Sequence, residues 1–119
     1  MDQTSEATLA EATTRIIKTT YYWQRVHAEE PTAIGDLYEP AALAAIAERC
    51  RELGITDVDL KDAIGADVEK RLLKHSLYVN LEADAERKAA VEQRIYQEAR
   101  VAYSIADLLL AAPVETAEN

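Results

Sequence analysis

The chain has 119 residues, the length of one domain, and its 22 acidic against 13 basic side chains give a formal net charge of −9. A field of this sign repels phosphate backbones and anionic lipid headgroups, which disfavours direct binding to nucleic acid or to a membrane surface. Gly and Pro number three each, whereas the good helix formers Ala, Leu, Glu, Lys and Arg dominate, so the composition predicts an all-α fold.

The first helix is expected from about Ser5 to Ala28. Its inward-facing residues recur at alternating steps of three and four, the stripe of an amphipathic helix, at Leu9, Ala12, Ile16, Thr19, Trp23 and Val26. A run of β-branched residues over 13–20 favours a strand, but the period of two that a strand requires is absent. Pro31 limits the helix, because the residue before a proline avoids the helical region.

A connector over 31–39 leads to a second helix, which has Pro40 at its first position. One face of this helix is apolar and carries Leu43, Ile46, Cys50 and Leu53. Gly54 stands where a left-handed C-cap residue belongs, and Ile55 is expected to fold back on Cys50.

The next segment predicts one short helix and the start of another. The short helix is expected over 57–64, with Thr56 or Asp57 as its N-cap. Gly65 is expected to end it, and Asp67 is the candidate N-cap of the helix that follows.

The last helix is expected over about 83–112, after a break at 80–84. Its apolar side carries Val91, Ile95, Ala102, Ile105 and Leu109. Thirty residues make about 45 Å of helix, longer than a compact domain of this size requires, so it either protrudes or is covered by another chain. Pro113 stops it. The prediction is therefore a small bundle of four to five helices with a long C-terminal helix, one domain over 1–112 and a tail over 113–119.

The sequence offers no motif for a metal, and no cofactor is expected. A di-iron bundle needs Glu three residues before its histidines, but Gln24 precedes His27 and Leu72 precedes His75. The acids over 57–62 resemble a calcium loop at a glance, yet the glycine and the closing Glu of that loop are missing. They are expected to be solvated acids at a helix start.

Nucleophilic chemistry is equally unsupported. Cys50 lies on an apolar helical stripe, so a buried structural thiol is expected rather than a reactive one. His75 is expected to be a hydrogen-bonded histidine at the edge of the core, and His27 to complement a helix C-terminus. No Ser is flanked by glycines, no Gly-rich loop cradles phosphate, and no pair of carboxylates stands out. The chain is predicted not to be an enzyme.

The compartment follows from what the sequence lacks. A lone Cys50 forms no internal disulfide, the N-terminus has no secretion-signal pattern, and no apolar run is long enough to span a bilayer. A cytoplasmic location is expected.

The helices on either side of Gly54 are spaced like a helix-turn-helix. The segment that would enter the DNA groove, residues 57–62, holds three acids and one lysine. Because those acids would face phosphates and base edges, a DNA reader is disfavoured.

Tyr21, Tyr22 and Trp23 are the most informative side chains for function. Successive helical residues point about 100° apart, so three in a row span about 200°, more than one core-facing stripe can bury. If Trp23 points inward, at least one tyrosine faces solvent or another chain. Tyr and Trp concentrate at interface hot spots, although an ordinary exposed tyrosine is the open alternative.

Four residues near the C-terminus add to this prediction. Tyr96 and Tyr103 lie seven apart and share a face beside the apolar stripe, which leaves core packing and partner contact both open. Leu108 and Leu110 flank Leu109, and three successive leucines cover most of a helix circumference. Unless helices of the same chain surround them, a neighbouring chain must. The residues expected to contact other proteins are therefore Tyr21, Tyr22, Trp23, Tyr96, Tyr103, Leu108 and Leu110.

Two stretches resemble the short helical head–tail connector (adaptor) proteins of tailed bacteriophages. They are Asp67-Val68-Glu69-Lys70-Arg71-Leu72-Leu73-Lys74-His75-Ser76-Leu77-Tyr78 and Arg94-Ile95-Tyr96-Gln97-Glu98-Ala99. A helix of mixed charge that ends in Leu-Tyr is followed by a long Ala-rich helix and a short tail, whereas the Tyr-Tyr-Trp first half departs from the family. The resemblance implies a virion location and a closed ring of copies, joined by heterologous interfaces, with tails docked on a portal.

Two hypotheses of function result. The first is a non-enzymatic assembly or adaptor protein, oligomeric in its working state, whose partners are other protein subunits. The second is a small acidic inhibitor or regulator, antitoxin-like or a polyanion mimic, in which the net charge of −9 attracts a basic partner. Binding that collapses with added salt would indicate the second, because an apolar interface largely survives salt.

Overall fold

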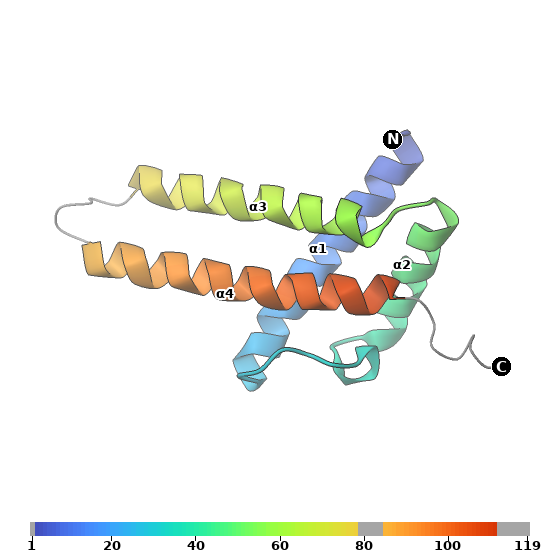
Figure 1. The fold of residues 1–119 in the computed structure, drawn as a ribbon, viewed down its shortest axis with the longest axis horizontal. Helices are drawn as coiled ribbons and strands as arrows, with labels where there is room; N and C mark the ends of the chain where they lie inside the picture. Colours follow the sequence, from blue (N-terminus) through green and yellow to red (C-terminus); the bar gives the residue numbers. More distant parts are fainter. Residues whose placement is uncertain (1, 79–84, 112–119) are drawn as a thin grey trace.

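The computed structural model describes residues 2–78 and 85–111. These residues form α1 (Gln3–Val26), the 3-10 turn η1 (Ile34–Asp36), α2 (Pro40–Glu52), α3 (Asp57–Tyr78) and α4 (Ala85–Leu110). The helices α3 and α4 lie side by side as an antiparallel pair, α1 crosses this pair, and α2 lies at one end (Figure 1). The predicted all-α bundle is confirmed over the described residues.

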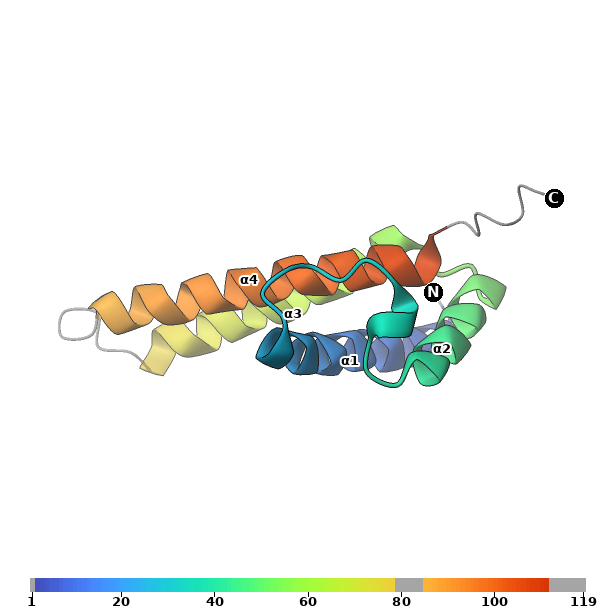
Figure 2. The same cartoon turned by 90° about the horizontal axis from the view of Figure 1, so that it is seen from below.

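The helices form two layers, α1 and α2 beneath the α3–α4 pair (Figure 2). The molecule measures 59 × 34 × 20 Å, and its radius of gyration is 16.1 Å, against about 13.5 Å for a compact chain of this length. One end of the α3–α4 pair extends past α1. The sequence predicts that the long last helix either protrudes or is covered by another chain. In the structure it protrudes, and α3 protrudes with it.

The core lies where the two layers cross. Its largest fully buried side chains are Ile16, Leu43, Ile46, Leu60, Ile64, Ile105, Leu109 and Cys50. The stripes expected on α1, α2 and α4 supply most of these residues. Two stripe residues are exposed: Val26 is 77% exposed at the last position of α1, and Leu53 is 36% exposed at the C-cap of α2. Both stand where a helix ends and its buried face stops.

The β-branched residues of α1 are accommodated by hydrogen bonds within the helix. The hydroxyl of Thr13 donates to the carbonyl of Leu9, and that of Thr20 donates to the carbonyl of Ile16, each at 2.8 Å. A threonine hydroxyl that bonds back to the preceding turn needs no water, so these side chains are buried without an unsatisfied donor. Packing thus overrides the weak strand preference.

Local signals define the ends of α2 and α3. Gly54 has φ +74°. The N–H of Ile55 donates to the carbonyl of Cys50 at 2.9 Å, and the N–H of Gly54 donates to the carbonyl of Arg51 at 3.1 Å. This is the expected C-cap, a Schellman motif. Thr56 is the N-cap of α3, because its hydroxyl accepts the N–H of Asp59 at 3.2 Å.

The prediction that a short helix ends before Gly65 is wrong. The helix α3 continues through Gly65 and Asp67 as far as Tyr78, and α4 begins at Ala85. A glycine inside a helix costs only about 0.5–1 kcal/mol, which packing against α1 and α4 easily outweighs. The break expected at 80–84 and the tail over 113–119 lie outside the described residues.

Polar contacts tie the layers together. The carboxylate of Glu30, in the connector after α1, accepts hydrogen bonds from Ser104 at 2.7 Å and from Arg100 at 2.9 Å, and both bonds lower the pKa of Glu30. From α2, the guanidinium of Arg51 donates to the carbonyl of Leu109 at 2.6 Å, which satisfies a carbonyl in the last turn of α4.

Candidate functional site

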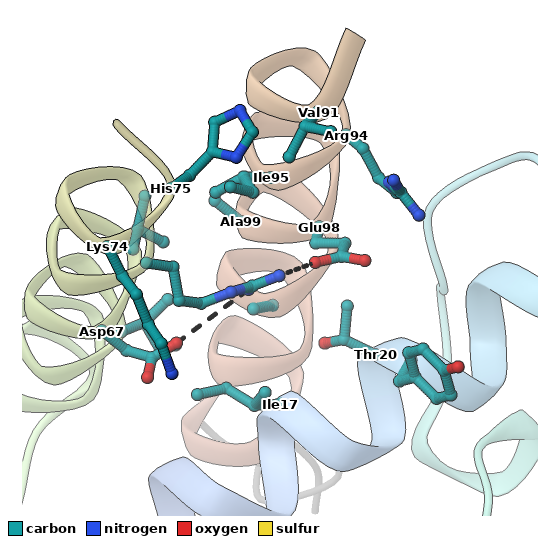
Figure 3. Close-up of a pocket in the computed structure, with 15 residues that line it drawn as sticks. Ile17, Thr20, Asp67, Lys74, His75, Val91, Arg94, Ile95, Glu98 and Ala99 are labelled. Atoms are coloured by element: carbon teal, nitrogen blue, oxygen red, sulfur yellow. Dashed lines mark hydrogen bonds and ion pairs between the residues drawn. The ribbon is translucent and has the colours of Figure 1, made fainter. Parts of the chain in front are cut away.

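The crossing of α1 with the α3–α4 pair leaves a half-open groove of about 530 Å³ (Figure 3). This volume lies within the range of about 300–1,000 Å³ that is usual for binding pockets. All three helices contribute to its mainly apolar floor, which includes Ile17, Ile64, Val68, Val91, Ile95 and Ala99. The floor is continuous with the core, so the groove is a place where core-type side chains remain accessible.

Charged side chains occupy the groove above this floor. The guanidinium of Arg71 forms ion pairs with Glu98 of α4 and, at 4.0 Å, with Asp67 of α3. Both groove carboxylates therefore share one cation. Lys74 and Arg94 extend on opposite sides of Glu98 (Figure 3), and neither forms an ion pair with any residue that the structure describes.

His75 closes one end of the groove, with its ring directed toward Val91 and Ile95 (Figure 3). Its Nε2 atom is buried and has no hydrogen-bond partner within residues 2–78 and 85–111. The expectation of a hydrogen-bonded histidine is wrong at this atom, because the neighbouring side chains of α4 are aliphatic. A buried polar atom without a partner costs about 1–3 kcal/mol.

Tyr21 brings the predicted aromatic group to the groove, of which it forms one wall. Tyr21 is 57% exposed, and its ring contacts that of Tyr22 edge-to-face, with 6.3 Å between the centroids. Tyr22 in turn stacks on Tyr38 of the connector at 4.5 Å. We call these three rings the tyrosine row. The expectation that at least one tyrosine of the Tyr-Tyr-Trp group faces outward is confirmed. Tyr38 was not predicted, since no helical period links the connector to α1.

Trp23 is turned inward instead. It packs partly buried against the core, its indole N–H donates to the carbonyl of Glu29 at 2.6 Å, and its ring stacks on His27 at 3.8 Å. These contacts within the chain occupy both its polar atom and one ring face. His27 is the C-cap residue of α1, the position expected for it.

The predicted contact residues of α4 do not reach the groove. Leu109 is buried, and Leu108 and Leu110 pack partly buried against the core. Helices of the same chain thus bury Leu109 and partly cover Leu108 and Leu110, so these leucines do not require a neighbouring chain. Tyr103 also packs against the core, whereas Tyr96 is 58% exposed on α4 and does not line the groove.

The remaining candidate residues have structural roles. Cys50 is buried, and this burial raises the pKa of its thiol. The side chain of Asp59 caps the start of α3 by accepting the N–H of Thr56 at 2.9 Å. The described residues contain no group of three or more His, Cys, Asp or Glu arranged to hold a metal ion. Over the same residues, none of the helices combines the length and apolar character needed to cross a bilayer.

Sequence reasoning missed Arg71, Lys74 and Arg94 as site residues. One signal was present: Arg94 and Glu98 follow Val91 and Ile95 at steps of three, so charged residues border the apolar stripe of α4. The direction in which α1 crosses decides that this border stays uncovered.

Comparisons with known proteins do not add to this picture. No family model, no curated protein and no solved structure matches the chain. The groove is therefore interpreted from its own chemistry.

Proposed function

We propose that this chain is a non-enzymatic protein-binding module, and that it binds another protein chain through the groove and the tyrosine row beside it. The observation that carries the proposal is a mainly apolar groove of about 530 Å³, open to solvent and bordered by exposed aromatic rings. Aromatic anchors beside an apolar patch are what protein interfaces use to obtain most of their binding energy.

The groove favours binding over chemistry because the hydroxyl of Thr20 and both carboxylates that line it are already engaged. Among the residues that the structure describes, Thr20 is the only serine or threonine that lines it, and its hydroxyl donates to the carbonyl of Ile16 at 2.8 Å. Its two carboxylates are both paired with Arg71. A nucleophile next to a free base, the arrangement that covalent catalysis requires, is absent from the described lining.

The protruding end of the α3–α4 pair supports an assembly role within this function. Leu73 and Leu77 lie four apart on α3, so they share a helix face, and they are 62% and 72% exposed. Large apolar side chains that remain exposed together favour contact with another subunit. A ring-forming connector subunit, as the phage resemblance implies, is one specific form of this proposal.

The distribution of charge favours a second candidate. Residues 1–67 hold 13 acidic and six basic side chains, so most of the net charge lies in this half. An acidic surface of this kind attracts a basic protein, which is the inhibitor or regulator alternative. Partner release by moderate salt would support it, because exposed charges are screened within about 8 Å at physiological ionic strength.

A matched pair of tyrosine variants tests the first proposal. Tyr21 and Tyr96 are almost equally exposed, at 57% and 58%, but only Tyr21 lines the groove. Tagged wild-type protein is cross-linked in its native cells, and its partners are compared with those of Tyr21→Ala and Tyr96→Ala. We expect Tyr21→Ala to lose a partner that Tyr96→Ala retains. A partner set that neither variant changes would contradict the proposed surface.

Light scattering after size-exclusion chromatography measures the assembly role separately. An oligomer, alone or with the captured partner, is expected. A monomer at high concentration that also stays alone when the partner is present would refute it.

A further inference from the structure

We infer that the occupant of the groove is an acidic amphipathic α-helix of a partner protein. Its apolar face lies on the groove floor and its carboxylates contact Lys74 and Arg94. The inference rests on the proposed function and names the class of partner that this site selects.

The first step concerns the charges inside the groove. Arg71 is held between Glu98 and Asp67, which are the only acidic side chains among the described residues that line the groove. Lys74 and Arg94 remain without an acidic partner in the described chain. An occupant that places carboxylates at these two positions forms ion pairs without displacing an existing one.

The second step concerns the rest of the molecule. The net charge of −9 would appear to repel an acidic ligand, but residues 68–111 hold seven acidic and seven basic side chains. Most groove residues belong to this electrically balanced segment. Because screening limits interactions between exposed charges to about 8 Å, the local cations decide the preference and the distant acids of α1 and α2 do not.

The third step concerns the shape of the occupant. The part of the α3–α4 pair that extends past α1 has no other helix of the described chain beneath it (Figures 1 and 2). A partner helix laid beside α1 would complete a three-helix arrangement and cover Val91 and Ile95. Helices dock in such grooves through apolar residues at steps of three, four and seven, which leaves the flanking positions for charged contacts.

A second copy of this chain is a poorer occupant. The exposed apolar helix face at the protruding end, Leu73 and Leu77, is flanked on α3 by Lys70 and Lys74. That face would bring lysines to a groove that already has unpaired cations. Like charges at an interface disfavour the pairing, so a separate acidic partner fits better.

The test uses the full chain and two designed fluorescent peptides in anisotropy titrations. Both peptides are helical, with identical leucines at steps of three and four; one carries glutamates at the flanking positions and the other carries lysines. We expect the glutamate peptide to bind at least about tenfold more tightly than the lysine peptide. Added salt should reduce this difference, because the discriminating contacts are partly exposed.

Charge-reversal variants locate the contact. Lys74→Glu and Arg94→Glu should each lower the affinity for the glutamate peptide by about fivefold or more. Lys18→Glu is the matched control, since Lys18 is exposed on α1 and does not line the groove, and it should change the affinity by less than about twofold. Circular dichroism confirms that each variant is folded.

Three outcomes would overturn the inference. The first is equal affinity for the two peptides, or no binding of either. The second is tighter binding of the lysine peptide that Tyr21→Ala abolishes, in which case the groove binds proteins but not acidic ones. The third is a wild-type dimer that Arg94→Glu dissociates, which assigns the groove to a second copy. All three leave the proposed function standing, whereas a native partner that Tyr21→Ala retains counts against the function itself.

Discussion

Two glycines of this chain are expected to respond in opposite directions to the same substitution. Gly65 lies inside α3, whereas Gly54, with φ +74°, is the left-handed residue directly after the C-cap Leu53 of α2. Alanine at Gly65 should stabilise the fold by about 0.5–1 kcal/mol, because it restricts the unfolded chain and suits the helix interior. Alanine at Gly54 should destabilise it by about 1 kcal/mol, since the left-handed conformation costs a Cβ-bearing residue about 1–2 kcal/mol.

The space around Gly65 decides how much of the gain is obtained. A Cβ at this position would lie 3.4 Å from the hydroxyl of Tyr103, and nothing lies within 4 Å of the corresponding position at Gly54. The hydroxyl is the far end of a partly buried side chain, so it can move aside by a small amount. In a Tyr103→Phe background the obstacle is gone and the full gain should appear.

Urea unfolding followed at 222 nm measures both effects. A change of 1 kcal/mol should move the midpoint by about 0.5 M in urea and the melting temperature by about 4 °C. The slope of the transition should stay the same in both variants. If Gly65→Ala instead destabilised the protein as much as Gly54→Ala does, Gly65 would be a helix terminus and the description of α3 as one continuous helix would be refuted.

Three further measurements test the core, the thiol and the connector. Ile16→Ala, at a fully buried position, should cost about 2–5 kcal/mol in urea unfolding, and a cost below 1 kcal/mol would contradict its place in the core. Cys50 is buried with a raised pKa, so a disulfide reagent at pH 8 should label it far more slowly in the native protein than in denaturant; equal rates would contradict burial. The pKa of Glu30 is lowered by Ser104 and Arg100, so its contribution is present above the usual pKa of glutamate, roughly 4.3, and is lost as pH falls through the lower folded value. Glu30→Gln should therefore flatten the acid side of the stability profile, and an unchanged profile would argue against this anchor.

The sequence alone determined those parts of the fold that depend on local chemistry. The spacing of Ala12 and Ile16 identified the buried face of α1, and Pro40 marked the start of α2. Gly54 and Ile55 identified the Schellman motif, because only a glycine readily adopts the left-handed C-cap and an apolar residue must follow it. Each of these signals involves residues within one or two helical turns of each other, so the chain encodes them without reference to the rest of the fold.

Only the tertiary structure decided the remaining features. The helix α3 passes through Gly65 because a glycine penalty of about 1 kcal/mol is small beside the packing of a whole helix face. Leu108 and Leu110 are partly buried by their own chain, whereas Tyr21 is 57% exposed, and the sequence pattern did not distinguish them. The groove with Lys74 and its neighbours exists because α1 crosses the α3–α4 pair instead of running along it. The direction in which helices cross is set by contacts between residues far apart in the chain, so helical periodicity does not predict it.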